Sequence, residues 1–180
     1  MTSPVFSHLL GSLTLLGVMI IIIATFVAVQ FIVESSLQEL RLSEVAESIA
    51  REIVELASIY TLGGSDLSYM DLKIPESLKN QGYKIELQDL GNGRFVVRVN
   101  LQVYQQVCVV VVPNFGERVV QVVEGEKWLT NNIYVSNTLL LPLPTREVGN
   151  TKLTGKPVII AYTSQDGVLY IGLGVIWGES

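Results

Sequence analysis

Few side chains in this sequence have the type and spacing that catalysis requires. Nucleophilic catalysis by a serine or a cysteine needs a histidine to take up the proton, and the one histidine, His8, lies in an apolar stretch at the start of the chain. The one cysteine, Cys108, lies in the apolar run 107–112, where we expect a buried side chain. The sequence therefore predicts no nucleophile with its base.

Metal and phosphate chemistry have equally little support. Asp66, Asp71 and Asp89 follow no ligand spacing, and the Gly-Asn-Gly segment 91–93 fits a hairpin turn rather than a phosphate-binding loop that opens a helix. We therefore expect no enzyme activity, no catalytic residue, no metal site and no cofactor. One alternative stays open, a glycosidase that uses a pair of carboxylates.

Aromatic side chains are the remaining candidates for a binding site. If exposed, they would stack on sugar rings, but large aromatics at alternating strand positions are more often core residues. Trp128 follows Lys127 in a stretch rich in turn residues and is the candidate best suited to an exposed position. The other four aromatic candidates are Tyr134, Tyr162, Tyr170 and Trp177.

The charge distribution argues against nucleic acid as a partner. The net charge is -5, and the sequence has no cluster of Lys and Arg of the kind that a phosphate backbone or an anionic lipid surface attracts. We therefore expect no nucleic-acid binding.

The first third of the chain predicts a long helix around which the rest is organised. Residues 1–33 contain no Asp, Glu, Lys or Arg, and 9–33 are almost wholly apolar. At roughly 1.5 Å per residue such a helix crosses a hydrocarbon layer of about 30 Å. It lacks the basic start and short apolar segment of a cleavable signal, so we expect it to be retained. The apolar residues expected to pack in an assembly are Leu13, Leu16, Ile20, Ile21, Ile23, Phe26, Val27 and Phe31.

From residue 34 the helical pattern continues but becomes amphipathic. Acidic residues and two arginines fall mostly off an apolar stripe with helical spacing. A stripe of this kind stabilises a helix only when something covers it, which here means neighbouring copies, a helix bundle or the chain's own β-domain. The stripe residues, also expected to serve assembly, are Leu37, Leu40, Val45, Ile49, Ile53, Leu56 and Tyr60.

After the helix, the period of the apolar residues changes from 3.6 to 2, which predicts strands. The fold class is expected to be α+β, with the helix over 1–61, a connector over 62–80 and an antiparallel Ig-like β-sandwich over 81–180. Two hairpins are clearest, joining 83–87 to 95–103 and 157–162 to 168–177.

The other expected strands are less regular. The run 107–112 predicts a strand covered on both faces, because it is apolar at every position. Gly172 and Gly174 lie within a strand pattern, which indicates either close approach of another backbone or an aromatic ring, or a simple bend. The remaining expected segments are strands at 118–123, 133–135 and 138–141, a turn at 124–127 and a polar loop at 145–156.

This layout resembles archaeal type IV pilins and the related archaellins. Residues 12–24 look like the hydrophobic half of the pilin helix, and 37–60 look like its second half. The resemblance implies a structural subunit of an extracellular filament, with the N-terminal helices packed as its core and the β-domains outside. It also implies copies of the chain as partners, a membrane anchor before assembly and a location at the cell surface, with a surface-layer protein or glycans as further candidate partners.

Two other functions stay open. One is a singly anchored extracytoplasmic β-sandwich that binds a partner, resembling the accessory proteins that link the archaellum motor to the surface layer. It accounts better for the lack of Lys and Arg in residues 1–10, where pilins usually carry a basic leader. The other is an anchored sugar-binding or hydrolytic domain, which needs an exposed aromatic cleft. If the chain is a filament subunit, a charge at Ile21 or Ile49 is expected to abolish assembly while the β-domain stays folded.

Overall fold

A computed structural model describes the chain over residues 4–63, 66–78, 80–91, 94–102, 107–112, 120–148, 151–164 and 167–179. It contains one long helix and two β-sheets, which confirms the predicted α+β class. The chain divides into two compact units, Met1–Gln38 and Glu39–Ser180. The division falls inside the helix, whereas the sequence placed a boundary at its end, because the second half of the helix belongs to the unit that holds the sheets.

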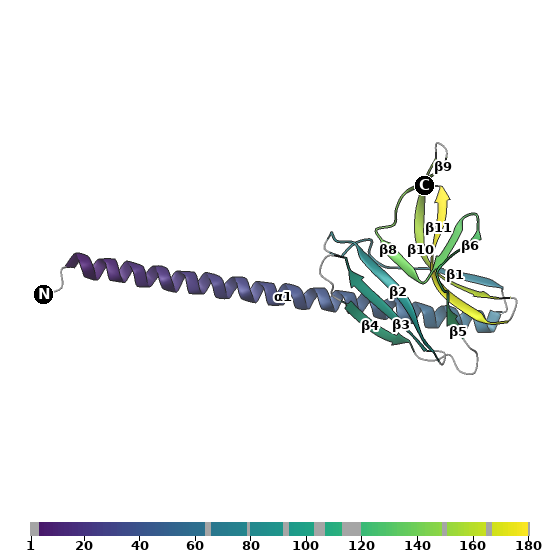
Figure 1. Ribbon diagram of the computed structural model, residues 1–180, viewed down its shortest axis with the longest axis horizontal. Coiled ribbons are helices and arrows are strands. Elements are labelled where there is room, and N and C mark those ends of the chain that lie inside the picture. The colour runs from purple at the N-terminus through teal and green to yellow at the C-terminus, as the bar shows by residue number, and fades with distance from the viewer. Residues whose placement is uncertain are drawn as a thin grey trace. The chain divides into compact units, whose positions relative to one another are not determined.

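Helix α1 spans Pro4–Gly63 as one continuous element (Figure 1). No proline follows Pro4 within it, so its backbone hydrogen bonds run without a missing donor. In the first unit every large apolar side chain from Phe6 to Leu37 is exposed. In the second unit, side chains at helical spacing are buried: Leu42, Val45, Ala46, Ile49, Ala50, Ile53, Leu56, Ala57 and Tyr60.

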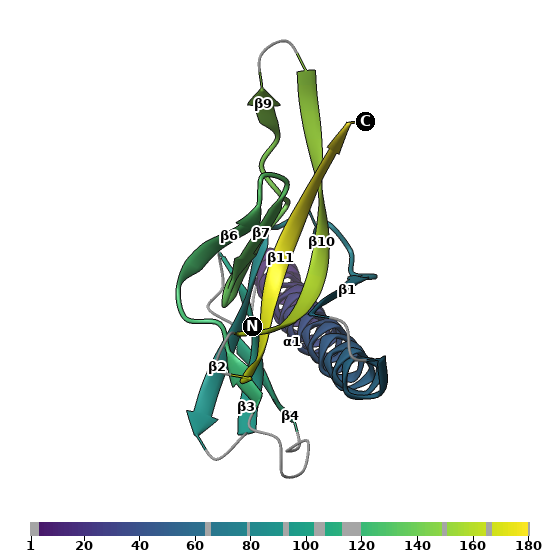
Figure 2. The ribbon, with the colours of Figure 1, turned by 90° about the vertical axis from the view of Figure 1, so that its right-hand side faces the viewer.

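The larger sheet is built around the long hairpin of β10 and β11, with the order β1-β10-β11-β7-β6. Its strands are β1 (Leu67–Asp71), β5 (Val120–Val122), β6 (Glu126–Thr130), β7 (Ile133–Ser136), β9 (Arg146–Val148), β10 (Thr151–Thr163) and β11 (Leu169–Glu179). Strand β5 pairs with the start of β11 in parallel orientation, and the other pairings are antiparallel. Figure 2 shows β9, the start of β10 and the end of β11 together at one end of the hairpin.

The smaller sheet contains the clearest predicted hairpin and has the order β4-β3-β2-β8. Its strands are β2 (Tyr83–Gly91), β3 (Arg94–Leu101), β4 (Val107–Val112) and β8 (Thr138–Leu141). The register pairs Tyr83 with Leu101 and Leu87 with Val97, so this hairpin is confirmed. On β3 the predicted alternation holds, since Val97 and Val99 are buried and Arg98 is half-buried on the other face. The end of the expected strand 95–103, at Val103, lies outside the described residues.

One hydrophobic core is shared by the second half of α1 and both sheets. Tyr60, near the end of the helix, hydrogen-bonds through its hydroxyl to that of Thr163 in β10. Tyr83 of β2 is fully buried and donates its hydroxyl to the backbone carbonyl of Pro75. Burial raises the pKa of the Tyr83 phenol, because the charged form would lose its water.

A smaller core lies on the other face of the larger sheet, and it leaves no room for a side chain at two glycines of β11. A Cβ at Gly172 would lie 2.5 Å from Cγ2 of Val135, and a Cβ at Gly174 would lie 2.3 Å from Cδ1 of Ile160. Val135 and Ile160 are core residues of this face, together with Val123 and Val158. Of the two alternatives, close approach therefore holds at both glycines, with aliphatic side chains and strand carbonyls, rather than an aromatic ring, as the nearest groups.

Strand β4 differs from the prediction of a strand covered on both faces. It lies at the edge of the smaller sheet, and the side chains of Val107, Val109 and Val111 are 52%, 48% and 58% exposed. Cys108 points to the other face and is half-buried rather than buried. An apolar run indicates a strand, but it does not report whether a second layer covers each face.

Three other segments also differ from their predicted structure. The expected connector 62–80 contains β1, the expected turn 124–127 contains the start of β6, and the expected polar loop 145–156 contains β9 and the start of β10. In each case the strand pairs with β10 or β7. Pairing with a long central strand allows a short polar segment to extend, so local composition underestimates the extent of the sheet.

Candidate functional site

The eight residues of the hydrophobic half of α1 that were expected to serve assembly all lie exposed in the first unit. Their exposed fractions run from 54% at Ile23 to 74% at Phe31. Helix α1 is long and apolar enough to cross a membrane, and none of its most apolar segment is buried against the rest of the chain. This surface is therefore available to lipid or to other helices.

The amphipathic stripe divides into two parts. Val45, Ile49, Ile53, Leu56 and Tyr60 are at most 7% exposed, because the sheets of the same chain cover them. The other two stripe residues, Leu37 and Leu40, are about half exposed.

This burial corrects the expectation for Ile49. Its side chain is fully buried in the core that α1 shares with the sheets. A charge there would lie in the core of the β-domain, so a folded domain is not the expected result. Of the two positions expected to accept a charge without unfolding the domain, Ile21 remains.

The described part of the β-domain contains a cavity of about 450 Å³ with aromatic walls, which we call the aromatic pocket. Strand pairing places three of its lining residues side by side on β6, β7 and β11. Trp128 pairs with Tyr134, and Tyr134 pairs with Val175. Trp177, two residues along β11, lies on the same face as Val175. The lining residues are Glu126, Trp128, Tyr134, Thr138, Leu139, Leu140, Leu143, Pro144, Thr145, Arg146, Val175 and Trp177.

A glycine makes room for the ring of Trp177. Gly155 of β10 is its cross-strand partner, and a Cβ there would lie 3.2 Å from the indole and 2.6 Å from a methyl group of Val175. Trp177 is 9% exposed, and its buried Nε1–H has no hydrogen-bond acceptor among the residues that the structure describes. This donor is enclosed in the core and is not accessible from the pocket.

The ring of Trp128 is held in place but stays open to solvent. Its centroid lies 5.3 Å from that of Tyr134, with the two planes 62° apart, and the guanidinium of Arg146 lies 4.8 Å from the indole centroid. The residue is nevertheless 49% exposed. This confirms the expectation that Trp128 is the exposed ring among the five aromatic candidates.

Two opposite charges lie at this pocket, on Glu126 and Arg146. Burial raises the pKa of the Tyr134 phenol, and the neighbouring carboxylate of Glu126 raises it further. Glu126 thus lies close to the ring that forms the inner wall. The pocket combines an apolar aromatic surface with one acceptor group and one donor group of opposite charge.

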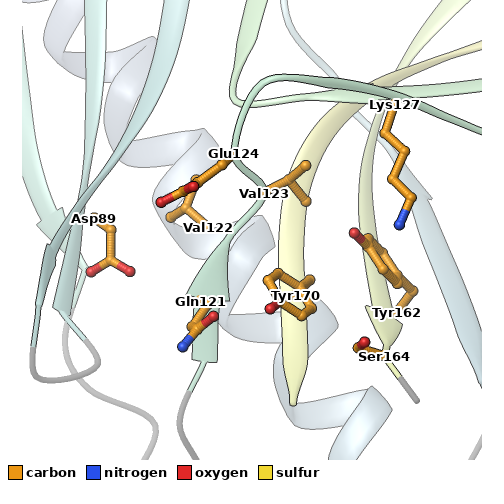
Figure 3. A pocket seen from close by; sticks show the side chains of 9 residues that line it. All are labelled: Asp89, Gln121, Val122, Val123, Glu124, Lys127, Tyr162, Ser164 and Tyr170. Carbon is orange, nitrogen blue, oxygen red and sulfur yellow. The ribbon is translucent and has the colours of Figure 1, made fainter. Parts of the chain in front are cut away.

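A second cavity, of about 440 Å³, lies on the opposite face of the larger sheet and is called the polar pocket (Figure 3). Tyr162 and Tyr170 stack in it with centroids 5.5 Å apart, and the ammonium of Lys127 lies 5.5 Å from the centroid of Tyr162. Burial raises the pKa of Tyr162, and the adjacent Tyr170 adds to this. The other lining residues are Asp89, Gln121, Val122, Val123, Glu124 and Ser164.

Neither pocket brings a serine or cysteine nucleophile together with a histidine base among its lining residues. The polar pocket contains a hydroxyl at Ser164, but no histidine lines it to act as a base. Within the described ranges, no three or more His, Cys, Asp or Glu side chains come together in a way that would hold a metal ion. Both pockets are suited to binding through rings and hydrogen bonds.

The structure thus brings the five aromatic candidates together in two groups. Trp128, Tyr134 and Trp177 line the aromatic pocket, and Tyr162 and Tyr170 line the polar pocket. Sequence reasoning missed Glu126 and Arg146, which come from segments expected to be a turn and a loop. Alternation along β6 was the available signal, since Lys127 and Trp128 must point to opposite faces.

Comparisons of the chain with protein-family models, with curated proteins and with solved structures gave no match.

Proposed function

We propose that this chain is a structural subunit of an extracellular filament of the type IV pilus kind. In this proposal the first unit of α1 packs with its equivalents in the filament core and the β-domain, an Ig-like sandwich, lies outside. Before assembly the same helix anchors the chain in the membrane. The observation that carries the proposal is the helical surface over 6–33, which is apolar all round and exposed.

The length of this surface supports packing against other helices. Residues 6–33 are 28 in number. At roughly 1.5 Å per residue they extend about 42 Å, against about 30 Å for a hydrocarbon core. A typical tilt of roughly 20° shortens the span to only about 39 Å. Helices packed side by side in a filament would cover the whole apolar length of this segment. A lipid bilayer alone would leave the part that extends beyond the hydrocarbon core among the lipid headgroups.

The buried stripe changes what assembly has to cover. Because the sheets already cover Val45 to Tyr60, neighbouring copies would need to cover only the first unit, which includes Leu37, together with Leu40. The β-domain has its own core and does not depend on neighbours for it. Subunit contacts therefore rest on the apolar half of α1.

The second candidate is a singly anchored extracytoplasmic protein that binds a partner through its β-domain. The burial of the stripe favours it as well, since a single copy leaves little of the amphipathic face uncovered. This candidate requires no second copy of the chain to cover the stripe. The two candidates differ in whether the exposed half of α1 contacts lipid or other helices.

Electron microscopy of the native protein, released from cell surfaces without detergent, tests the proposal. Uniform filaments are expected, with the mass of this chain as their subunit in the same sample. Discrete particles that need detergent to stay soluble would contradict it and favour the anchored protein.

Two substitutions locate the contact. Ile21→Lys is expected to abolish filaments, because a cation among packed apolar helices costs about 3 kcal/mol at a membrane-like centre. Gly17→Leu keeps the segment apolar, and a Cβ at Gly17 meets nothing in the chain itself, so reduced assembly would report crowding between helices. Ile21→Leu is the matched control. Normal filaments from Ile21→Lys would show that this part of α1 is not the core.

A further inference from the structure

We propose that the aromatic pocket is a carbohydrate-binding site that takes a neutral pyranose unit of a glycan. The proposal does not depend on filament formation, because every lining residue belongs to the unit Glu39–Ser180. It names a site and a ligand class within the β-domain, which neither of the two functions above specifies.

The aromatic walls supply the surface that a sugar ring needs. The C–H face of a pyranose is apolar and weakly positive, and it stacks on the negative face of an aromatic ring. Trp128 offers a large exposed ring whose plane is fixed by Tyr134 and by the guanidinium of Arg146. A ring fixed before binding loses little conformational freedom when the ligand arrives.

The polar groups around these walls match the edge of a sugar. Hydroxyl groups both donate and accept, so they can pair with the carboxylate of Glu126, the guanidinium of Arg146 and the hydroxyls of Thr138 and Thr145. One acid and one base leave the pocket without net charge, which favours a neutral ligand.

The same groups disfavour a purely apolar occupant. An aliphatic peptide side chain or a lipid tail would fill the cavity of about 450 Å³ but would leave Glu126 and Arg146 desolvated without new partners. The size is within the usual range for small-molecule sites of roughly 300 to 1,000 Å³.

The chain carries its own probe for this site. Its only two tryptophans, Trp128 and Trp177, both line the aromatic pocket. Intrinsic tryptophan fluorescence of the full chain therefore reports on this pocket. The chain is kept in lauryldimethylamine oxide micelles, because detergents with sugar headgroups would compete.

The test titrates this sample with maltose, cellobiose, lactose, mannobiose and diacetylchitobiose. At least one is expected to give a saturable change in fluorescence with a Kd of about 1 mM, the affinity that a few hydrogen bonds and one stacked ring support. Glycerol at equal concentration controls for solvent effects. No saturable response to any of these sugars up to about 50 mM would overturn the proposal.

Substitutions separate the pocket from the rest of the domain. Trp128→Ala is expected to weaken sugar binding at least tenfold by calorimetry, and Trp128→Tyr to retain most of it because a ring remains. Glu126→Gln should weaken binding several-fold. Lys127→Ala is the matched control, because this neighbour in β6 contributes to the polar pocket on the opposite face. Equal loss from Lys127→Ala and Trp128→Ala, with both variants folded by circular dichroism, would place the sugar elsewhere.

Discussion

Replacing Gly174 by alanine should destabilise the β-domain through a single added methyl group. A Cβ at this position would lie 2.3 Å from Cδ1 of Ile160 and 2.6 Å from the backbone carbonyl oxygen of Tyr134. The Ile160 methyl can turn away, but the carbonyl belongs to β7, which pairs with β11 at this point. The two strands must therefore move apart or distort.

The magnitude follows from comparison with a second glycine of the same strand. Overpacking of this kind costs about 1 to 3 kcal/mol. Gly→Ala also stabilises by about 0.4 to 1 kcal/mol, because the unfolded chain loses freedom. Gly178→Ala shares that gain, and a Cβ there meets nothing within 4 Å. The difference between the two variants isolates the packing cost of about 1 to 3 kcal/mol.

Guanidinium unfolding of the full chain in micelles, followed by tryptophan fluorescence, measures this difference. With a slope of about 4 kcal/mol per M, Gly174→Ala should unfold at a midpoint about 0.3 to 0.8 M lower than Gly178→Ala. Adding Ile160→Val should recover only part of the loss, because the Tyr134 carbonyl remains. Equal midpoints for Gly174→Ala and Gly178→Ala would refute the reasoning, since packing around Gly174 would then impose no cost.

Two further predictions concern the core. Ile49→Ala should lower the free energy of unfolding by about 2 to 4 kcal/mol, because Ile49 is fully buried. Leu40→Ala, at an exposed position of the same helix, should change it by less than about 0.5 kcal/mol. Equal effects of the two substitutions in denaturant titrations would show that the helix does not pack on the sheets as described. The stability of the chain should fall as pH rises above 10.0, because burial raises the pKa of Tyr83 in the folded state and only the unfolded chain then loses the proton. Tyr83→Phe should flatten this dependence between about pH 9 and 11, and an unchanged slope would show that other groups cause it.

Local patterns predicted the elements whose stabilising contacts are close in sequence. The hairpin of β2 and β3 follows from alternation on both sides of a glycine turn, and α1 follows from a charge-free segment that runs into an amphipathic one. Gly172 and Gly174 stood out within a strand pattern, but the pattern left close approach and a bend both open, and only their neighbours on β7 and β10 decide for close approach.

Features that depend on distant partners were not predictable in this way. A stripe such as Val45 to Tyr60 reports that something covers it, but not whether the cover is the same chain or another. The run Val107–Val112 looks buried because its residues are apolar, while its exposed face depends on its place at a sheet edge. The aromatic pocket needs β6, β7, β11 and the segment after β8 to meet, so its residues are recognisable only once the pairing is known.

The continuity of α1 has a mechanical consequence for the molecule. The exposed first unit and the buried stripe belong to one continuous helix, so the sheets are attached to the first unit through a helix that is part of their own core. Tension applied to the β-domain would therefore pass directly into the buried stripe and pull the helix along its axis against the sheets. Many side chains would have to slide together before any one of them separates, so such a domain should yield at higher force than one attached through a loop.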